Sequence, residues 1–318
     1  MNFRWRKRTL VLLAAGCVGI LVVIAWYHFS LRRPVGSGPA GPPVNRARFG
    51  EVWTDRPVFL VGLGDSVTAG LGARKGYSYF DRLLGNPLDE FEDMKGVHVA
   101  RVFPSLRSTN LAISGTTSRE HLERQMPRLP ESPSNELVVV VFTTGGNDLI
   151  HNYGRVPPRA DGMYGATYEE AVPWIGTFEE RLEEMIGRIQ TAYPDRCQIF
   201  LANIYDPTDG VGDIEKSGMP PWPDGLRIHA DYNRILAACA GRHANVHLVD
   251  LHAAFLGHGL HCTQFWREHY RSEDPHYWYY INLEDPNERG YDAIRRLFLN
   301  AMAEVFEDIG VVTRGDAE

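Results

Sequence analysis

Short runs of consecutive apolar residues recur along the chain after residue 57, and they constrain its fold more than any other feature. Each run is five or six residues long: 58–62 (VFLVG), 137–142 (LVVVVF), 198–202 (QIFLA) and 246–251 (VHLVDL). Continuous rather than alternating runs are typical of strands that are buried on both faces. With 109–113 as a weaker fifth strand, they predict a parallel five-stranded sheet.

The stretches between these runs have helical patterns. A capping box, Thr117 three residues before Glu120, opens a predicted helix over 117–126. Further amphipathic patterns predict helices over 178–193, 230–240 and 290–309, and the Pro- and Gly-rich stretch 205–225 is expected to be a long surface loop. Strands that alternate with helices predict an α/β fold, a three-layer α/β/α sandwich.

The N-terminal part of the chain has a different character. Residues 9–27 (TLVLLAAGCVGILVVIAWY) form an uncharged run of 19 residues, which at about 1.5 Å per residue just spans a bilayer core of roughly 30 Å. Four basic residues precede the run and only Arg32 and Arg33 follow closely, so the N-terminus is expected in the cytoplasm. The sequence therefore predicts a single-pass membrane protein whose main domain is periplasmic or extracellular.

Two other interpretations of this run stay open. A cleaved signal peptide is one, although no clear small-x-small site follows the run. A lipoprotein is the other, since Ala15-Gly16-Cys17 loosely resembles a lipoprotein box, but the residues after Cys17 remain apolar. The predicted organisation is a basic cytoplasmic end (1–8), a transmembrane signal anchor (9–29), a Pro/Gly-rich linker (30–50) that acts as a semi-extended spacer, and the main domain (51–318).

The charge of the chain limits its possible partners, and its cysteine content limits the disulfides that it can form. The first 33 residues hold six basic residues and no acidic one, which leaves 27 basic and 40 acidic residues in the remainder, a net charge of −13. Such a domain repels phosphate backbones, so no nucleic-acid partner is predicted. Cys17 belongs to the apolar run, and the odd set Cys197, Cys239 and Cys262 allows at most one disulfide in an oxidising compartment.

Polar motifs follow the first three predicted strands, where ligands bind in sheets of this kind. They read GDSVTAG (64–70), NLAISG (110–115) and TTGGND (143–148). Ser66 would lie near a helix N-terminus, where an oxyanion is favoured. The Gly115 N–H and the Asn147 side-chain amide are suitable donors to such an oxyanion. Each motif alone is more often a turn or a helix cap, but the three together predict an active site.

These motifs resemble those of the SGNH (GDSL) hydrolase family, over roughly residues 57–310. The resemblance implies a flavodoxin-like sandwich that acts on ester bonds. It also implies that Ser66 is the nucleophile, and that the Ser66 N–H, the Gly115 N–H and the Asn147 side chain form the oxyanion hole.

The fourth motif departs from the family pattern, Asp-x-x-His-Pro before the last helix. Here the chain reads Asn282-Leu283-Glu284-Asp285-Pro286, so Asp285 stands at the histidine position and Asn282 at the aspartate position. A free carboxylate is a weaker base than imidazole by about 2.6 pKa units. Burial beside Glu284 would raise the pKa of Asp285, and a carboxyl tuned to about 6 could both accept and return a proton.

A histidine from elsewhere is the other hypothesis for the base. His276 lies nine residues before Asp285, and His258 follows the fifth predicted strand. His258, His261 and Cys262 also have a spacing that suits a metal, but they lack a fourth ligand in register, and no metal site is predicted. The catalytic candidates are therefore Ser66, Asp285 and His276.

The sequence thus predicts a serine esterase that hydrolyses acyl or acetyl esters at the cell envelope through an acyl-enzyme on Ser66, without a cofactor. The substrate would be a small-molecule, glycan or lipid ester. A catalytically silent domain that binds an acylated glycan or a partner, and an O-acyltransferase, are the alternatives. An aromatic-rich segment before Asp285 predicts either a packed cap or a wall for a sugar or acyl chain: Phe265, Trp266, Tyr270, Tyr277, Trp278, Tyr279 and Tyr280.

Overall fold

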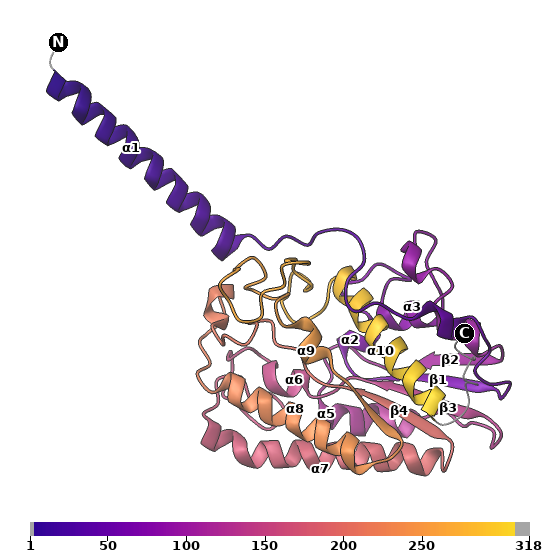
Figure 1. Ribbon diagram of the computed structural model, residues 1–318. Helices are drawn as coiled ribbons and strands as arrows, with labels where there is room; N and C mark the ends of the chain where they lie inside the picture. Colours follow the sequence, from indigo (N-terminus) through magenta and orange to yellow (C-terminus); the bar gives the residue numbers. More distant parts are fainter. Residues whose placement is uncertain (1–2, 309–318) are drawn as a thin grey trace.

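The computed structural model describes residues 3–308, which form an α/β domain with one long helix projecting from it (Figure 1). Residues 1–2 and 309–318 lie outside the described residues. The first two belong to the predicted basic end, and the last ten belong to the predicted domain and include Ile309, the end of the last predicted helix. Five parallel strands lie in the order β2-β1-β3-β4-β5. Their bounds are β1 (Val58–Leu63), β2 (Leu106–Asn110), β3 (Leu137–Phe142), β4 (Cys197–Ala202) and β5 (Val246–Val249). This is the flavodoxin-like strand order, and the predicted fold is confirmed.

Helices cover both faces of the sheet, and the strands supply a core to each. Along β1, Val58 and Leu60 belong to one buried cluster, while Phe59 and Val61 belong to the other. Successive side chains of a strand point to opposite faces, so a strand with no polar residue serves two cores. The first cluster packs against α10 (Glu288–Asp308), and the second packs against α7 (Tyr168–Ala192) and α8 (Gly225–Arg242).

Short helices connect these elements. They are η2 (Arg46–Phe49), α2 (Ser66–Ala69), α3 (Tyr79–Leu84), η3 (Glu92–Met94), α4 (Val99–Val102), α5 (Ser118–Glu120), η4 (His121–Gln125), η5 (Met126–Arg128), α6 (Gly146–Ile150), η6 (Ile214–Ser217) and α9 (Leu251–Phe255). The capping box of Thr117 and Glu120 is present as predicted. The helix that it opens is not one α-helix over 117–126, because the chain passes from α5 into the wider turn of η4 and the tighter turn of η5.

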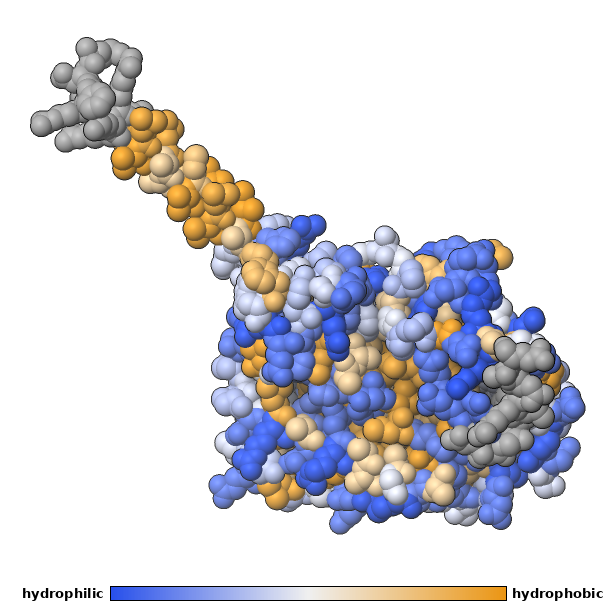
Figure 2. All heavy atoms as spheres, in the orientation of Figure 1, coloured by the Kyte–Doolittle hydropathy of each residue, from blue (hydrophilic) through white to orange (hydrophobic). Residues whose placement is uncertain are grey.

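The N-terminal helix α1 (Phe3–Trp26) continues into η1 (Tyr27–Leu31). Residues 10–31 are long and apolar enough to cross a membrane, and none of this stretch is buried against the domain. Figure 2 shows it as an apolar rod beside a domain whose visible face is largely hydrophilic. By length and composition it fits either a membrane anchor or a signal sequence.

Part of the predicted linker (30–50) lies along the domain in the structure, over residues 34–44. The buried Arg289 guanidinium donates to the carbonyls of Val35, Gly38 and Pro39 at 3.0–3.3 Å. Gly41 lies so close to α10 that a Cβ there would stand 2.6 Å from the Ala293 backbone. An extended Pro/Gly segment makes no internal hydrogen bonds, so its carbonyls are free to accept from the arginine.

Candidate active site

Ser66 stands where β1 ends and α2 begins. The turn requires glycine at position 64, which has φ 128° and whose Cβ would lie 2.3 Å from the Thr143 carbonyl oxygen. Ser66 is the first residue of α2, and Asp65 caps the helix by accepting from the Val67 N–H at 3.1 Å. The first amides of a helix have no intrahelical acceptor, so the Ser66 N–H is available to an oxyanion.

Asp65, the residue before Ser66, is buried. Its Oδ1 accepts from the Thr143 hydroxyl at 2.9 Å, and that hydroxyl lies 2.9 Å from the Thr68 hydroxyl, which reaches Tyr79 at 2.7 Å. Burial raises the pKa of Asp65 to about 6. The hydrogen bonds from Thr143 and Val67 oppose this rise, and the charge of Asp285 adds to it. This chain of buried hydroxyls fixes the Asp65 carboxyl and so the start of α2.

The two other predicted oxyanion donors, Gly115 and Asn147, lie on the neighbouring loops. Gly115 has φ 79°, and a Cβ there would meet nothing within 4 Å, so its backbone faces open space. Asn147 lies on α6 and donates one N–H of its side chain to the Thr116 carbonyl at 2.9 Å. An amide group carries two N–H donors, so this bond orients the Asn147 side chain and leaves the second N–H free for a substrate oxygen.

Two buried side chains that the sequence analysis did not single out hold these loops together. Asp148 accepts from the Ser118 N–H at 2.8 Å and from its hydroxyl at 2.5 Å, which ties α6 to α5. Gln125 forms a pair of hydrogen bonds with the backbone of Gly64, at 2.9 and 2.7 Å. The only sequence signal for Gln125 is a polar residue on the predicted helix 117–126, which does not reveal its partner.

Asp285 is buried next to Ser66, at the position where the family pattern has histidine. Its Oδ2 accepts from the Asn282 side-chain amide at 2.6 Å, and its N–H donates to Asn282 Oδ1 at 3.2 Å. Its Oδ1 is buried and has no hydrogen-bond partner among the described residues. Burial raises the pKa of Asp285, while the side chains of Ser66 and Asn282 lower it by a smaller amount.

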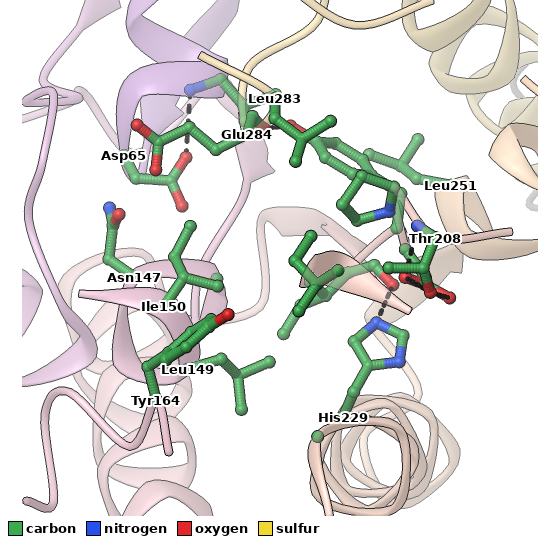
Figure 3. Close-up of a pocket in the computed structure, with 18 of the residues that line it drawn as sticks. Asp65, Asn147, Leu149, Ile150, Tyr164, Thr208, His229, Leu251, Leu283 and Glu284 are labelled. Atoms are coloured by element: carbon green, nitrogen blue, oxygen red, sulfur yellow. Dashed lines mark hydrogen bonds between the residues drawn. The ribbon is translucent and has the colours of Figure 1, made fainter. Parts of the chain in front are cut away.

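Glu284 adds a third carboxyl to the same corner, as Figure 3 shows beside Asp65. It accepts from the Tyr153 hydroxyl and, at 3.2 Å, from the Asn282 amide. Burial first, and then the charges of Asp285 and Asp65, raise the pKa of Glu284 to about 7. Three carboxyls this close cannot all ionise without mutual repulsion, so the corner retains protons near neutral pH.

A cavity of about 160 Å³ opens from this corner. Ser66, Asp65, Asn147 and Glu284 line one end of it, and the rest of the wall is mostly apolar. In Figure 3, Leu149, Ile150 and Tyr164 lie along one side, and His229 stands across the cavity from Asn147. The apolar lining includes Ile204, Tyr205, Ile214, Met219, Trp222, Leu226, Leu251 and Leu283. Much of it comes from the predicted surface loop 205–225, whose role the sequence did not reveal.

The other predicted base, His276, does not line this cavity. Its Nδ1 lies 2.5 Å from Asp274, and a Cβ on Gly36 would touch its ring at 2.5 Å. Asp274 is in turn bound by both Nη atoms of Arg289 at 2.9 Å. His276 therefore belongs to the contact between linker and domain.

The two other histidines of the sequence analysis, His258 and His261, have structural partners. The His258 ring stacks on Trp278 at 3.5 Å, and His261 lies 2.7 Å from Asp213. The one histidine among the residues that line the cavity is His229, whose Nε2 lies 2.8 Å from the Ile204 carbonyl oxygen. Burial lowers the pKa of His229.

The aromatic-rich segment does not form a wall of the cavity. Tyr277, Trp278 and Tyr279 are buried in the core, while Phe265 and Trp266 are exposed. This agrees with the packed cap rather than with a sugar platform.

Among the described residues, one trio of ligand-type side chains lies close enough together to hold a metal ion: Glu183, Cys239 and His243. They belong to α7 and α8 and the turn that follows, and none of them lines the cavity. Both carboxylate oxygens of Glu183 are already paired, with Arg242 and with His243. All four cysteines carry free thiols.

Comparisons with known proteins agree with the fold and with the motifs. Residues 63–293 match the model of the GDSL-like lipase/acylhydrolase family. An extracellular lipase from Streptomyces rimosus has a similar structure, with a TM-score of 0.50 and 18% identity, over 77% of this chain and 99% of the lipase. Axe2, an acetylxylan esterase from Geobacillus stearothermophilus, has a TM-score of 0.49 and 18% identity, over 78% and 94%.

Among curated proteins, the uncharacterized YpmR of Bacillus subtilis is 25% identical over 157 residues. The match covers 49% of this chain, and the chain spans only 55% of the length of that relative.

Proposed function

The chain belongs to the GDSL-like lipase/acylhydrolase family, and on that premise we propose that it is a serine esterase in which Ser66 is the nucleophile and Asp285 the general base. Membership of the family supports the hydrolysis of ester bonds in general. The assignment of Ser66, of Asp285 and of the oxyanion donors is the finer proposal, and so is the location at the cell envelope.

One observation carries the proposal. The Asp285 carboxyl lies beside Ser66 with one oxygen held by Asn282 and the other, Oδ1, buried and unpartnered among the residues described. A base that must accept the proton of the serine hydroxyl requires such an oxygen at this place.

The proposed reaction uses these groups in two half-reactions. Ser66 Oγ attacks the carbonyl carbon of the ester while its proton passes to Asp285, and the carbonyl oxygen becomes an oxyanion held by the Ser66 and Gly115 N–H groups and by Asn147. The tetrahedral intermediate collapses, the bond to the alcohol breaks, and Asp285 returns the proton to the leaving oxygen. Water then attacks the acyl-enzyme and gives a proton to Asp285, the bond between the acyl carbon and Ser66 Oγ breaks, and Asp285 passes the proton to Oγ as the carboxylic acid leaves.

The raised pKa of Asp285 suits both proton transfers. A carboxyl at its ordinary pKa of 3.8 would accept the serine proton weakly and hold it too weakly to protonate the leaving group. Burial strengthens the base by destabilising its charged form. His276 and Asp285 were both predicted as bases, and the position of Asp285 next to Ser66 favours Asp285.

The apolar cavity supports an acyl chain longer than acetyl as the substrate group. The cavity begins at Ser66, and its wall includes Leu149, Ile150 and Leu226, whose side chains offer no partner for a sugar hydroxyl. Each buried methylene contributes about 0.8 kcal/mol, or roughly fourfold in kcat/KM. We therefore propose that kcat/KM rises from acetate towards longer chains until the cavity is filled.

The test uses the full chain in detergent, p-nitrophenyl esters from acetate to octanoate, and a fluorophosphonate probe followed by mass spectrometry. Covalent labelling at Ser66, turnover, and loss of both in Ser66→Ala by at least about a thousandfold are expected. Ser272→Ala, at an exposed serine outside the cavity, is the matched control. Undiminished turnover by Ser66→Ala would refute the assignment, and a folded wild type with neither label nor turnover would support the silent binding domain.

A further inference from the structure

Three aromatic side chains meet where the apolar helix joins the domain. Phe29 of η1 packs edge-on against Phe265 and Trp266, with ring centroids 5.8 and 4.8 Å apart, and Phe265 and Trp266 lie 5.0 Å from each other. We call these three residues the juxtamembrane cluster. Phe265 is 65% and Trp266 54% exposed, so this packing leaves more than half of each side chain uncovered.

The cluster is attached firmly to the end of the apolar helix. Gln264 Nε2 donates to the Phe29 carbonyl at 2.8 Å, and the Thr263 hydroxyl donates to the His28 carbonyl at 3.2 Å. The last carbonyls of a helix have no intrahelical donor, so side chains of the domain satisfy them here. Figure 1 shows the loops between α9 and α10 beside the end of α1.

The position of Phe29 along the apolar stretch determines the depth of the juxtamembrane cluster in the bilayer. The stretch runs over residues 10–31, and 22 residues at about 1.5 Å per residue have the length of a bilayer core of roughly 30 Å. Phe29 lies in its last turn, at the boundary between hydrocarbon and headgroups. Phe265 and Trp266 touch Phe29 and must lie at the same level, where aromatic rings are enriched in membrane proteins.

From this continuity with the apolar helix we propose that Phe265 and Trp266 insert into the interface of the bilayer from which α1 emerges. The partner is a lipid surface, and the contact fixes the orientation of the domain on it. The inference rests on the membrane anchor of the proposed function. The same segment between α9 and α10 carries Asn282 and Asp285, so the loop that would enter the interface also forms one side of the active site.

The test is a depth measurement on the full chain in vesicles of equal parts phosphatidylcholine and phosphatidylglycerol. An environment-sensitive fluorophore is placed on the native Cys17, or on Phe265→Cys, Trp266→Cys or Val172→Cys in a Cys17→Ala background. The other cysteines, Cys197, Cys239 and Cys262, are buried and are not expected to react. Val172 is the matched control, because it is an apolar residue, 50% exposed, on α7 at the far side of the domain (Figure 1).

Quenching by nitroxides at the headgroup level is expected at positions 265 and 266, and by nitroxides deep in the acyl chains at Cys17. The probe at 172 should respond to aqueous iodide alone. All cysteine variants should turn over a soluble ester like the wild type, because none of the substituted residues lines the cavity.

The outcomes separate the two proposals. Probes at 265 and 266 that behave like the one at 172, while Cys17 stays in lipid, would overturn this inference and leave the anchor intact. A Cys17 probe exposed to water would overturn the anchor and the inference together. Probes at 265 and 266 shielded both from iodide and from lipid nitroxides would assign the surface to a second copy of the chain and also overturn the inference.

Discussion

Asn282 and Asp285 both differ from the family pattern, and the two differences are complementary. A catalytic histidine donates its ring N–H to the residue that orients it, so that residue must accept, as aspartate does. A carboxylate can only accept, so its orienting residue must donate, and Asn282 donates to Asp285 at 2.6 Å. The replacement of one partner therefore matches the replacement of the other.

This complementarity predicts the effect of exchanging the pair. Asp285→Asn removes the proposed base and should lower kcat by about 10²–10⁴-fold. Asp285→His alone leaves the histidine beside a neutral amide, which carries no charge to stabilise the imidazolium, whereas Asn282→Asp with Asp285→His restores the family pattern. The double variant should exceed Asp285→His in kcat/KM, and the acid limb of its pH profile should move to about 6.5.

His276→Ala is measured in parallel. A larger loss in His276→Ala than in Asp285→Asn would contradict the assignment of the base and favour His276.

Glu284 makes a prediction about stability. Its pKa rises from 4.5 to about 7 on folding, so the folded state binds its proton more tightly than the unfolded state. Its contribution is fully present below pH 4.5 and is lost as the pH rises through about 7. Glu284→Gln should therefore raise the free energy of unfolding by about 1–2 kcal/mol more at pH 8 than at pH 5, after allowance for its partial exposure.

Urea denaturation at the two pH values measures this difference. Glu304→Gln, at an exposed glutamate of α10, is the control. An equal effect of Glu284→Gln at both pH values would show that this carboxyl ionises normally in the folded protein.

Among the secondary-structure elements, the sequence predicted the bounds of a strand best where the strand is buried on both faces. The third strand matches its predicted bounds, and the first, fourth and fifth differ at their ends by one or two residues. The second strand lies three residues earlier than predicted, at Leu106–Asn110, because it is the edge strand and its residues are exposed or half-buried, so it lacks an apolar run.

The helix predicted over 178–193 begins ten residues earlier, at Tyr168. Pro173 lies within that extension and usually indicates a break, yet the capping box of Thr167 and Glu170 starts the helix before it. For the site, the motifs predicted which loops meet at the sheet edge. They did not predict that Gln125 and Asp148 hold these loops together, or that the loop 205–225 forms part of the cavity wall, since these features depend on contacts between distant segments.

The bound linker makes a prediction about truncation. A fragment that begins at residue 46 loses the carbonyls that accept from Arg289 and the Ala40 N–H that donates to Asp292 at 3.0 Å. It should be less stable than a fragment from residue 32 by at least about 3 kcal/mol. Thermal and urea unfolding of the two fragments measures this. Arg289→Gln in the longer fragment should reproduce part of the loss, and equal stability of the fragments would show that the linker contact is weak.

At the scale of the whole molecule, the apolar helix predicts how the protein partitions. Residues 9–31 include no Asp, Glu, Lys or Arg, and residues 10–27 are exposed, so the full chain should stay with the membrane pellet after an alkaline carbonate wash. The fragment from residue 32 should appear in the supernatant. A mature protein that is shorter than the full chain and soluble would instead establish the cleaved signal peptide.

The hold of Arg289 on the linker backbone also sets the reach of the enzyme. The eleven residues 34–44, if extended and free, would allow an excursion of about 36–40 Å, but residues bound along the domain allow almost none. With α1 in a bilayer, Ser66 would stay within a thin layer above the lipid headgroups. Encounters with substrate would then be governed by lateral diffusion in two dimensions, and esters deep in a surrounding polymer would react only after moving to that layer.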